Sequence, residues 1–196
     1  MKTKIILALL SITLAANVHA QQGKRYDSTM KLGKAGYRVR CNNKNVEKNS
    51  LNVNPIGFEN GVRDVDLEVK GRVNKAEIDD LNNDGFPELV LYVVNTADKN
   101  KINIFCISSK GNSSMAGVYF PDILDDPKLR VGYNGNDEYE LLQGTLLRRF
   151  PLYTTDSTDV HPTGLYRQVQ YTVVTGERGE LRFKVLRSYD YDKNKK

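Results

Sequence analysis

The sequence predicts a single all-β domain, and the main reason is the alternation of apolar and polar residues along the chain. Such alternation is typical of strands with one buried and one solvated face. One further segment is apolar at every position, as expected of a central strand. The alternating segments are 37–41, 65–70, 102–107, 166–174 and 181–186, and the fully apolar segment is 89–94.

Two further observations support this fold class. Turn-forming residues separate the apolar segments, and no apolar stripe with a helical period of 3.6 residues persists. Gln143-Gly144 lies between two strand-like runs, 138–142 and 145–150, which predicts a hairpin. Residues 122–129 could form one or two helical turns. We therefore expect an antiparallel β-sandwich or barrel-like domain of about nine or ten strands with at most a short helix.

The start of the chain has the pattern of a signal peptide. Lys2 and Lys4 precede the apolar run 5–16, and Val18-His19-Ala20 places small residues at the positions that a signal peptidase requires. The run is too short for a membrane span, which needs about 20 residues. We therefore expect cleavage after residue 20, a periplasmic or secreted protein without membrane insertion, one domain over 21–190, and a charged tail over 191–196.

Charge gives a weak constraint on partners. Removal of the signal peptide leaves 27 basic and 24 acidic side chains. This small excess argues against nucleic acid binding. The distribution is uneven, because residues 21–48 carry eight basic and only two acidic side chains. That segment is either an ordinary solvated face or a surface for a charged partner.

The expected mature chain contains two cysteines, Cys41 and Cys106. An exported protein meets an oxidising environment, so a disulfide between them is one alternative. The other is a pair of buried thiols that pack as small apolar groups.

A loop rich in oxygen-bearing side chains suggests a calcium site. Asp80, Asn82, Asp84 and Glu88 stand at positions one, three, five and nine of the loop, and Gly85 stands at position six. Hard oxygen ligands at this spacing suit calcium, although position twelve is not the glutamate that an EF-hand requires. The alternative is a turn in which the Asp and Asn side chains bond to their own backbone. Calcium is the one cofactor that the sequence suggests.

Charged residues around the predicted hairpin point to structure more than to catalysis. Arg148 and Arg149 follow one another on a strand, and an inward arginine needs a carboxylate partner. Asp137 and Glu138 across the hairpin are the candidates for a structural ion pair. Glu138 and Glu140 share a strand face, so a glycan-hydrolysing enzyme with two carboxylates is a further alternative. Since His161 is the one histidine after the signal peptide, we expect no enzyme with a nucleophilic triad.

Four segments together resemble the periplasmic inhibitors of invertebrate-type lysozyme. They occur in the order of that family, within about residues 80–175, whereas residues 21–75 carry no resemblance. The segments are Asp80-Leu-Asn-Asn-Asp-Gly-Phe-Pro-Glu-Leu89, Gly132-Tyr-Asn-Gly-Asn-Asp-Glu-Tyr139, Gly144-Thr-Leu-Leu-Arg-Arg-Phe-Pro-Leu-Tyr153, and Pro162-Thr-Gly164 with Arg167-Gln168 and Tyr171.

The resemblance implies an exported β-sheet protein that blocks the active-site cleft of a lysozyme, or another glycan hydrolase, with a protruding loop. The family loop contains Ser-Gly and a nearby tyrosine, and this chain has no Ser-Gly dipeptide. A binding module of the cell envelope, stabilised by calcium and without inhibitory activity, is the alternative function. The sequence does not determine the oligomeric state or the role of residues 21–60. The residues of the corresponding loop here are Asn95, Thr96, Asp98, Lys99, Asn100 and Lys101.

Overall fold

The computed structural model of the chain describes residues 24–59, 61–95, 101–156, 159–193 and 195. The described residues form twelve strands and one short 3₁₀ helix, so the all-β prediction is confirmed and the expected number of strands was too low. None of the described helical structure could cross a membrane. The elements are β1 (Tyr26–Leu32), β2 (Ala35–Cys41), β3 (Asn49–Ile56), β4 (Val65–Val69), β5 (Arg72–Asp79), β6 (Glu88–Val94), β7 (Ile102–Lys110), β8 (Ser114–Tyr119), η1 (Ile123–Asp125), β9 (Glu138–Leu142), β10 (Thr145–Asp156), β11 (Asp159–Thr175) and β12 (Leu181–Asp192).

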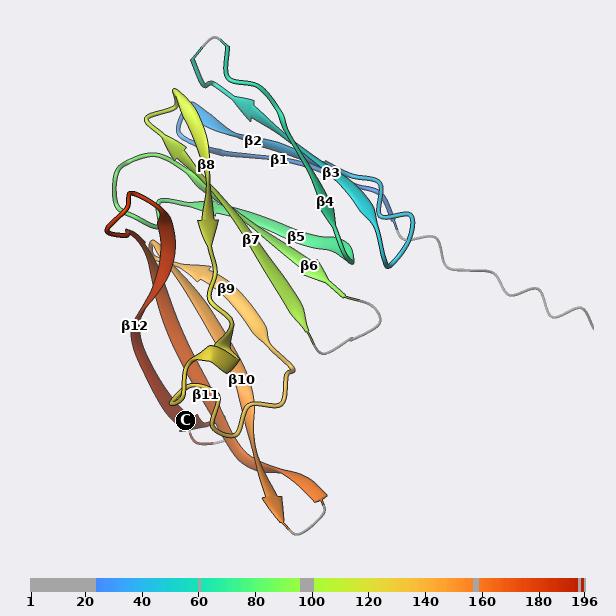
Figure 1. Ribbon diagram of the computed structural model, residues 1–196, viewed down its shortest axis with the longest axis vertical. Coiled ribbons are helices and arrows are strands. Elements are labelled where there is room, and N and C mark those ends of the chain that lie inside the picture. Colours follow the sequence, from blue (N-terminus) through green and yellow to red (C-terminus); the bar gives the residue numbers. More distant parts are fainter. Residues whose placement is uncertain (1–23, 60, 96–100, 157–158, 194, 196) are drawn as a thin grey trace, which may run out of the picture.

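The strands form two sheets of unequal size. Four antiparallel strands follow the order β1-β2-β3-β4, and eight follow the order β5-β6-β7-β8-β12-β11-β10-β9. The small sheet lies over the part of the large sheet formed by β5–β7, and β9–β12 form the other end of the molecule (Figure 1). The large sheet curls so that its two edge strands, β5 and β9, approach each other. The Gly144 N–H beside β9 donates to the Asp79 carboxylate at the end of β5 over 2.9 Å. The fold is therefore a barrel-like sheet with a second sheet stacked on it.

Strand β6 has two buried faces because it separates two cores. Leu89, Leu91 and Val93 pack in the core between the two sheets. Val90 and Tyr92 pack in the core enclosed by the large sheet. The fully apolar segment of the sequence is therefore the central strand that it predicts, and it is paired with β5 and β7 on its two sides.

The hairpin of β9 and β10 is also confirmed. Its turn residues Gln143 and Gly144 have φ angles of 49° and 71°. A two-residue hairpin turn of type I′ needs positive φ at both positions, which glycine adopts without a steric penalty. This turn aligns Arg149 with Glu138 and Arg148 with Tyr139.

The last strand extends two residues into the expected C-terminal tail. Strand β12 continues through Asp192, which pairs with Leu165 of β11. Asp190 accepts two hydrogen bonds from the Arg167 guanidinium, at 2.7 and 2.9 Å. Regular strand pairing and this ion pair therefore attach the charged C-terminal end of β12 to β11.

Candidate functional site

The loop implied by the family resemblance connects the ends of β6 and β7. Pairing of these strands extends to Val94 and Ile102, and the Asn95 N–H donates to the Lys101 carbonyl over 3.4 Å. We call the described residues Val94, Asn95, Lys101 and Ile102 the β6–β7 hairpin end. The other predicted loop residues lie outside the described residues, namely Thr96, Asp98, Lys99 and Asn100.

A basic pocket borders one side of the hairpin end. Its volume is about 530 Å³, and Val94 contributes to its wall. Lys24, Arg25 and Arg72 line the same pocket. Arg72 is aligned with Val94 by the pairing of β5 and β6, so its position relative to the hairpin end is set by backbone hydrogen bonds. Positive charge therefore gathers beside the hairpin end.

A second pocket borders the other side of the hairpin end. It has a volume of about 280 Å³, and Lys101, Asp122, Tyr139 and Arg148 are among the residues that line it. It lies along residues 102–105 of β7. These residues do not pair with β8, because β8 pairs only with residues 106–110 of β7. The hairpin end thus lies between two concave surfaces that together contain five basic residues.

The sequence analysis did not identify the basic pocket. Lys24 and Arg25 precede β1, whereas Arg72 opens β5, so the pocket exists only after the two sheets have packed. The excess of basic residues over 21–48 was the available signal. It suggested a charged surface without locating it.

Among the four candidates for a structural ion pair, Arg148 and Asp137 form a buried one. Arg148 donates from Nε to one carboxylate oxygen of Asp137 over 2.7 Å and from a terminal nitrogen to the other over 3.0 Å. The Tyr133 hydroxyl donates to the same carboxylate over 2.6 Å. The Arg148 guanidinium also lies within 6 Å of the ring centres of Tyr133, Tyr139 and Phe150. All these partners belong to the chain itself, so the contacts have a structural role. They hold the segment before β9 against β10.

The other two candidates for the structural ion pair, Arg149 and Glu138, have different partners. Arg149 donates to Glu140 over 2.8 Å and to the Gln168 side chain over 2.7 Å. Glu138 accepts from Lys193 over 3.4 Å. Arg149 is therefore paired with the glutamate two residues beyond the predicted partner. Glu138 and Glu140 each have a separate basic partner, and both side chains are about half exposed.

The Asp80–Glu88 segment has the hydrogen bonds of a turn. The Asp80 carboxylate accepts from the backbone N–H groups of Asp84 and Gly85, at 3.1 and 2.8 Å. Asn82 accepts from Asp84 N–H, and Asp84 accepts from Phe86 N–H. The oxygens proposed as calcium ligands are thus engaged with the loop's own backbone. Among the described residues, no cluster of acidic, histidine or cysteine side chains forms a metal-binding group.

Glu88, the fourth proposed ligand, is separated from the other three. Its carboxylate accepts from Leu81 N–H and from the Ser108 hydroxyl, each over 2.7 Å. The residue is completely buried. Burial raises the pKa of Glu88 to about 7, although both hydrogen bonds favour the ionised form.

The disulfide alternative for Cys41 and Cys106 was wrong, because both are free thiols. Cys41 on β2 packs in the core between the sheets, together with Ile107 of β7. Cys106 precedes Ile107 and faces the core enclosed by the large sheet. Consecutive strand residues point to opposite faces, so β7 itself separates the two sulfur atoms.

Comparison with known proteins adds no family to this description. No protein-family model matches the chain, and no curated protein matches its sequence. The resemblance to lysozyme inhibitors therefore depends on the four segments quoted above.

Proposed function

We propose that this chain is an exported binding protein that blocks the active-site cleft of a lysozyme or a related glycan hydrolase with the β6–β7 loop. The observation that carries the proposal is the position of the hairpin end between two pockets, one of which has a basic lining. The chain would act stoichiometrically and would perform no chemistry of its own. The resemblance over residues 80–175 suggests the class of target.

Charge complementarity supports this target. Glycan hydrolases of this kind use two carboxylates in a cleft. A lysine that enters such a cleft forms charge-assisted hydrogen bonds, which are stronger than neutral ones. Lys101 stands at the hairpin end, and Lys99 belongs to the same loop in the sequence. Lys24, Arg25 and Arg72 would then face the rim of the cleft and increase the rate of association.

The rigidity of the support also favours such a role. Binding is tighter when a loop does not lose much conformational freedom on association. The β6–β7 pair reaches the hairpin end without interruption, and β6 is buried on both faces. The base of the loop is therefore held by the best-packed strand of the molecule.

The proposal is tested by titrating the mature protein against invertebrate-type, chicken-type and goose-type lysozymes in a lysis assay. We expect one class to lose activity at an equimolar ratio. The double variant Lys99→Ala/Lys101→Ala should raise the inhibition constant by at least about tenfold, because it removes two charged contacts from a desolvated cleft. Full lytic activity of all three classes in a molar excess of the protein would reject the proposal.

Lys110→Ala is the matched control. Lys110 is an exposed lysine at the opposite end of β7, beside the turn to β8. This variant should inhibit as strongly as the parent protein. Equal inhibition by the double variant and the parent would remove the β6–β7 loop from the mechanism.

A further inference from the structure

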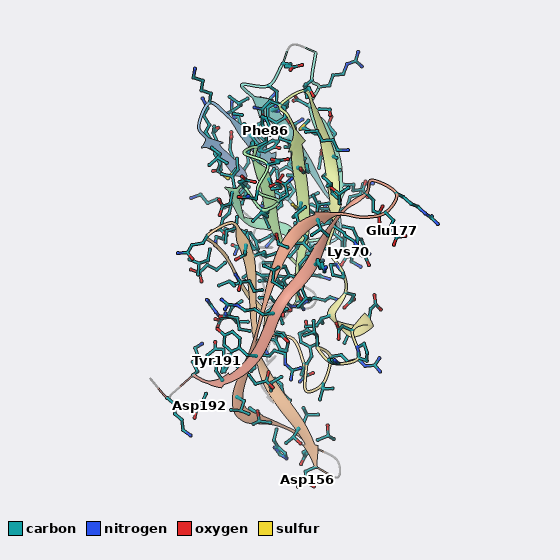
Figure 2. The ribbon with its side chains drawn as sticks, turned by 90° about the vertical axis from the view of Figure 1, so that its left-hand side faces the viewer. Lys70, Phe86, Asp156, Glu177, Tyr191 and Asp192 are labelled. Carbon is teal, nitrogen blue, oxygen red and sulfur yellow. The ribbon has the colours of Figure 1, made fainter. Side chains whose placement is uncertain are left out.

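A third concave surface, distinct from the two pockets beside the β6–β7 hairpin end, lies at the base of the β10–β11 hairpin. It has a volume of about 520 Å³. Strands β10 and β11 extend beyond their outer neighbours here, since β9 ends opposite Arg149 and β12 ends opposite Leu165. The projecting hairpin reaches Asp156 at the lower end of Figure 2, below Tyr191. We call this surface the tyrosine groove, and it is lined by Asn136, Glu138, Pro151, Tyr153, Pro162, Gly164, Leu165, Tyr166 and Lys193.

A β-bulge shapes the groove. Pro151 is aligned with Tyr166 and Tyr153 with Pro162, so two steps on β10 correspond to four on β11. Thr163 satisfies the irregular backbone, because its hydroxyl donates to the Leu152 carbonyl and accepts from Leu165 N–H. Bulges re-aim side chains and are frequent beside binding sites. The irregularity brings Tyr153, Tyr166 and both prolines to the border of one groove.

Gly164 keeps the groove open. Its φ is +82°, a conformation that side chains disfavour, and a Cβ atom placed on it would meet no atom within 4 Å. The position therefore faces free space, and glycine is favoured there by the backbone conformation of the bulge rather than by a lack of room. Any larger residue would both strain this backbone and project from the lining of the groove.

The groove combines aromatic surface with hydrogen-bonding groups. The Asn136 amide donates to the Tyr153 hydroxyl over 3.1 Å, which leaves its carbonyl oxygen as an acceptor. Lys193 pairs with Glu138 and lies 4.6 Å from the ring centre of Tyr166. The ammonium group has three donors and the carboxylate has two acceptor oxygens, so both retain further capacity. Donors and acceptors thus stand next to two half-buried tyrosine rings.

The aromatic surface continues beyond the groove along β12. The ring centres of Tyr166 and Tyr191 are 6.1 Å apart, and those of Tyr191 and Tyr189 are also 6.1 Å apart. Tyr189 is 46% exposed, and its hydroxyl accepts a hydrogen bond from the Gln168 amide over 2.7 Å. The row of rings is long enough to contact more than one unit of an extended ligand.

This combination identifies the class of ligand. A lipid chain would cover the remaining donors and acceptors of the ion pair and the amide without bonding to them, and a small anion would meet the Glu138 carboxylate. A saccharide presents an apolar C–H face for packing on rings and hydroxyls that both donate and accept hydrogen bonds. Its repeating units would also follow the row of rings. We infer that the tyrosine groove is a binding site for a short oligosaccharide, independent of the proposed inhibitory loop.

The test is a titration of the mature protein with the β-1,4-linked trimer of N-acetylglucosamine and with cellotriose, followed by amide NMR. We expect the resonances of Tyr153, Tyr166 and Lys193 to shift with a Kd of about 1 mM for at least one trisaccharide. Tyr166→Ala should raise this Kd by about tenfold through the loss of ring packing. The matched control is Tyr119→Ala, which removes another exposed tyrosine, on β8, and should leave the Kd unchanged.

A second variant guards against a loss of folding. Glu138→Ala removes an acceptor from an exposed side chain and should weaken binding several-fold while the spectrum stays native. Lys101→Ala should leave saccharide binding unchanged, so failure of the groove and failure of the inhibitory loop are distinguishable. The inference is overturned if neither trisaccharide shifts these resonances. It is also overturned if Tyr166→Ala weakens lysozyme inhibition while no saccharide binds, which would make the groove a protein contact.

Discussion

Glu88 is an acidic residue in a site that excludes water. It is fully buried at the start of β6, and its two carboxylate oxygens accept from β7 and from the preceding loop. The sequence analysis proposed Glu88 as a calcium ligand because of its spacing from Asp80, Asn82 and Asp84. Ser108, twenty residues away, provides the contact that gives it another role, and spacing along the chain could not reveal that contact.

The first prediction concerns the pH dependence of stability. The pKa of Glu88 is about 7 in the folded chain and near 4.5 when unfolded, so the folded state retains a proton that the unfolded state loses between these values. The contribution of Glu88 to the free energy of unfolding is fully present below pH 4.5, decreases as the pH rises to about 7, and is then constant. The total decrease is about 3 kcal/mol.

Urea denaturation of the parent and of Glu88→Gln from pH 5 to 8 measures this effect. The neutral amide should flatten the profile because it does not titrate. Glu140→Gln changes a half-exposed carboxylate and should keep the parental slope. A parental slope in Glu88→Gln would show that another group titrates.

At the scale of elements, the buried ion pair fastens the segment before β9 to β10. Asp137→Asn keeps the size of the side chain but leaves the Arg148 charge without its partner, in a site where the Asp137 and Arg148 side chains are 0% and 5% exposed. Loss of one partner from a buried pair costs about 3–5 kcal/mol. We expect a decrease of this size in the free energy of unfolding, measured by urea denaturation.

The pair of Asp27 and Arg38 is a natural control for this prediction. It joins β1 to β2 with the same two-contact geometry, at 3.0 Å for each contact, but both side chains are at least 40% exposed. Asp27→Asn should therefore lower the free energy of unfolding much less than Asp137→Asn does. Equal losses in the two variants would mean that the buried pair contributes no more than a solvated one.

The elements that sequence analysis did not place are β1, β3, β5 and β8. Strand β3 contains three asparagines and a proline, which are depleted in strands, yet Leu51 and Val53 alternate into the core. Strand β5 is polar because it borders the large sheet and buries few of its side chains. Strands β1, β3 and β5 pair with strands that are their neighbours in the sequence, and β8 also pairs with the distant β12. This pairing determines such strands more than their own composition does.

At the scale of the whole molecule, the two cores share strands β6 and β7 and are expected to unfold together. Cys41 reports on the core between the sheets and Cys106 on the core enclosed by the large sheet. Both thiols are buried, and burial raises the pKa of the Cys106 thiol, which lowers its reactivity. Each should be unreactive to Ellman's reagent in the folded protein.

We expect both thiols to become reactive in a single urea transition that coincides with the loss of β-sheet circular dichroism. Cys41→Ala and Cys106→Ala variants assign the signal to each core. Two separate transitions would show that the cores are independent. Failure of both thiols to react in the unfolded parent until a reductant is added would indicate a disulfide.

The sequence by itself determined the class of the fold, the central strand 89–94, the β9–β10 hairpin and the four candidates among which Arg148 and Asp137 form a buried ion pair. These depend on local periodicity, on turn residues and on contacts across one hairpin, so neighbouring residues contain the information. Tertiary structure alone decided the separation of the two cysteines, the burial of Glu88, the basic pocket beside the hairpin end and the tyrosine groove. Each of these requires segments that are distant in the chain to meet, and only the packing of the two sheets and the bulge in β10–β11 bring them together.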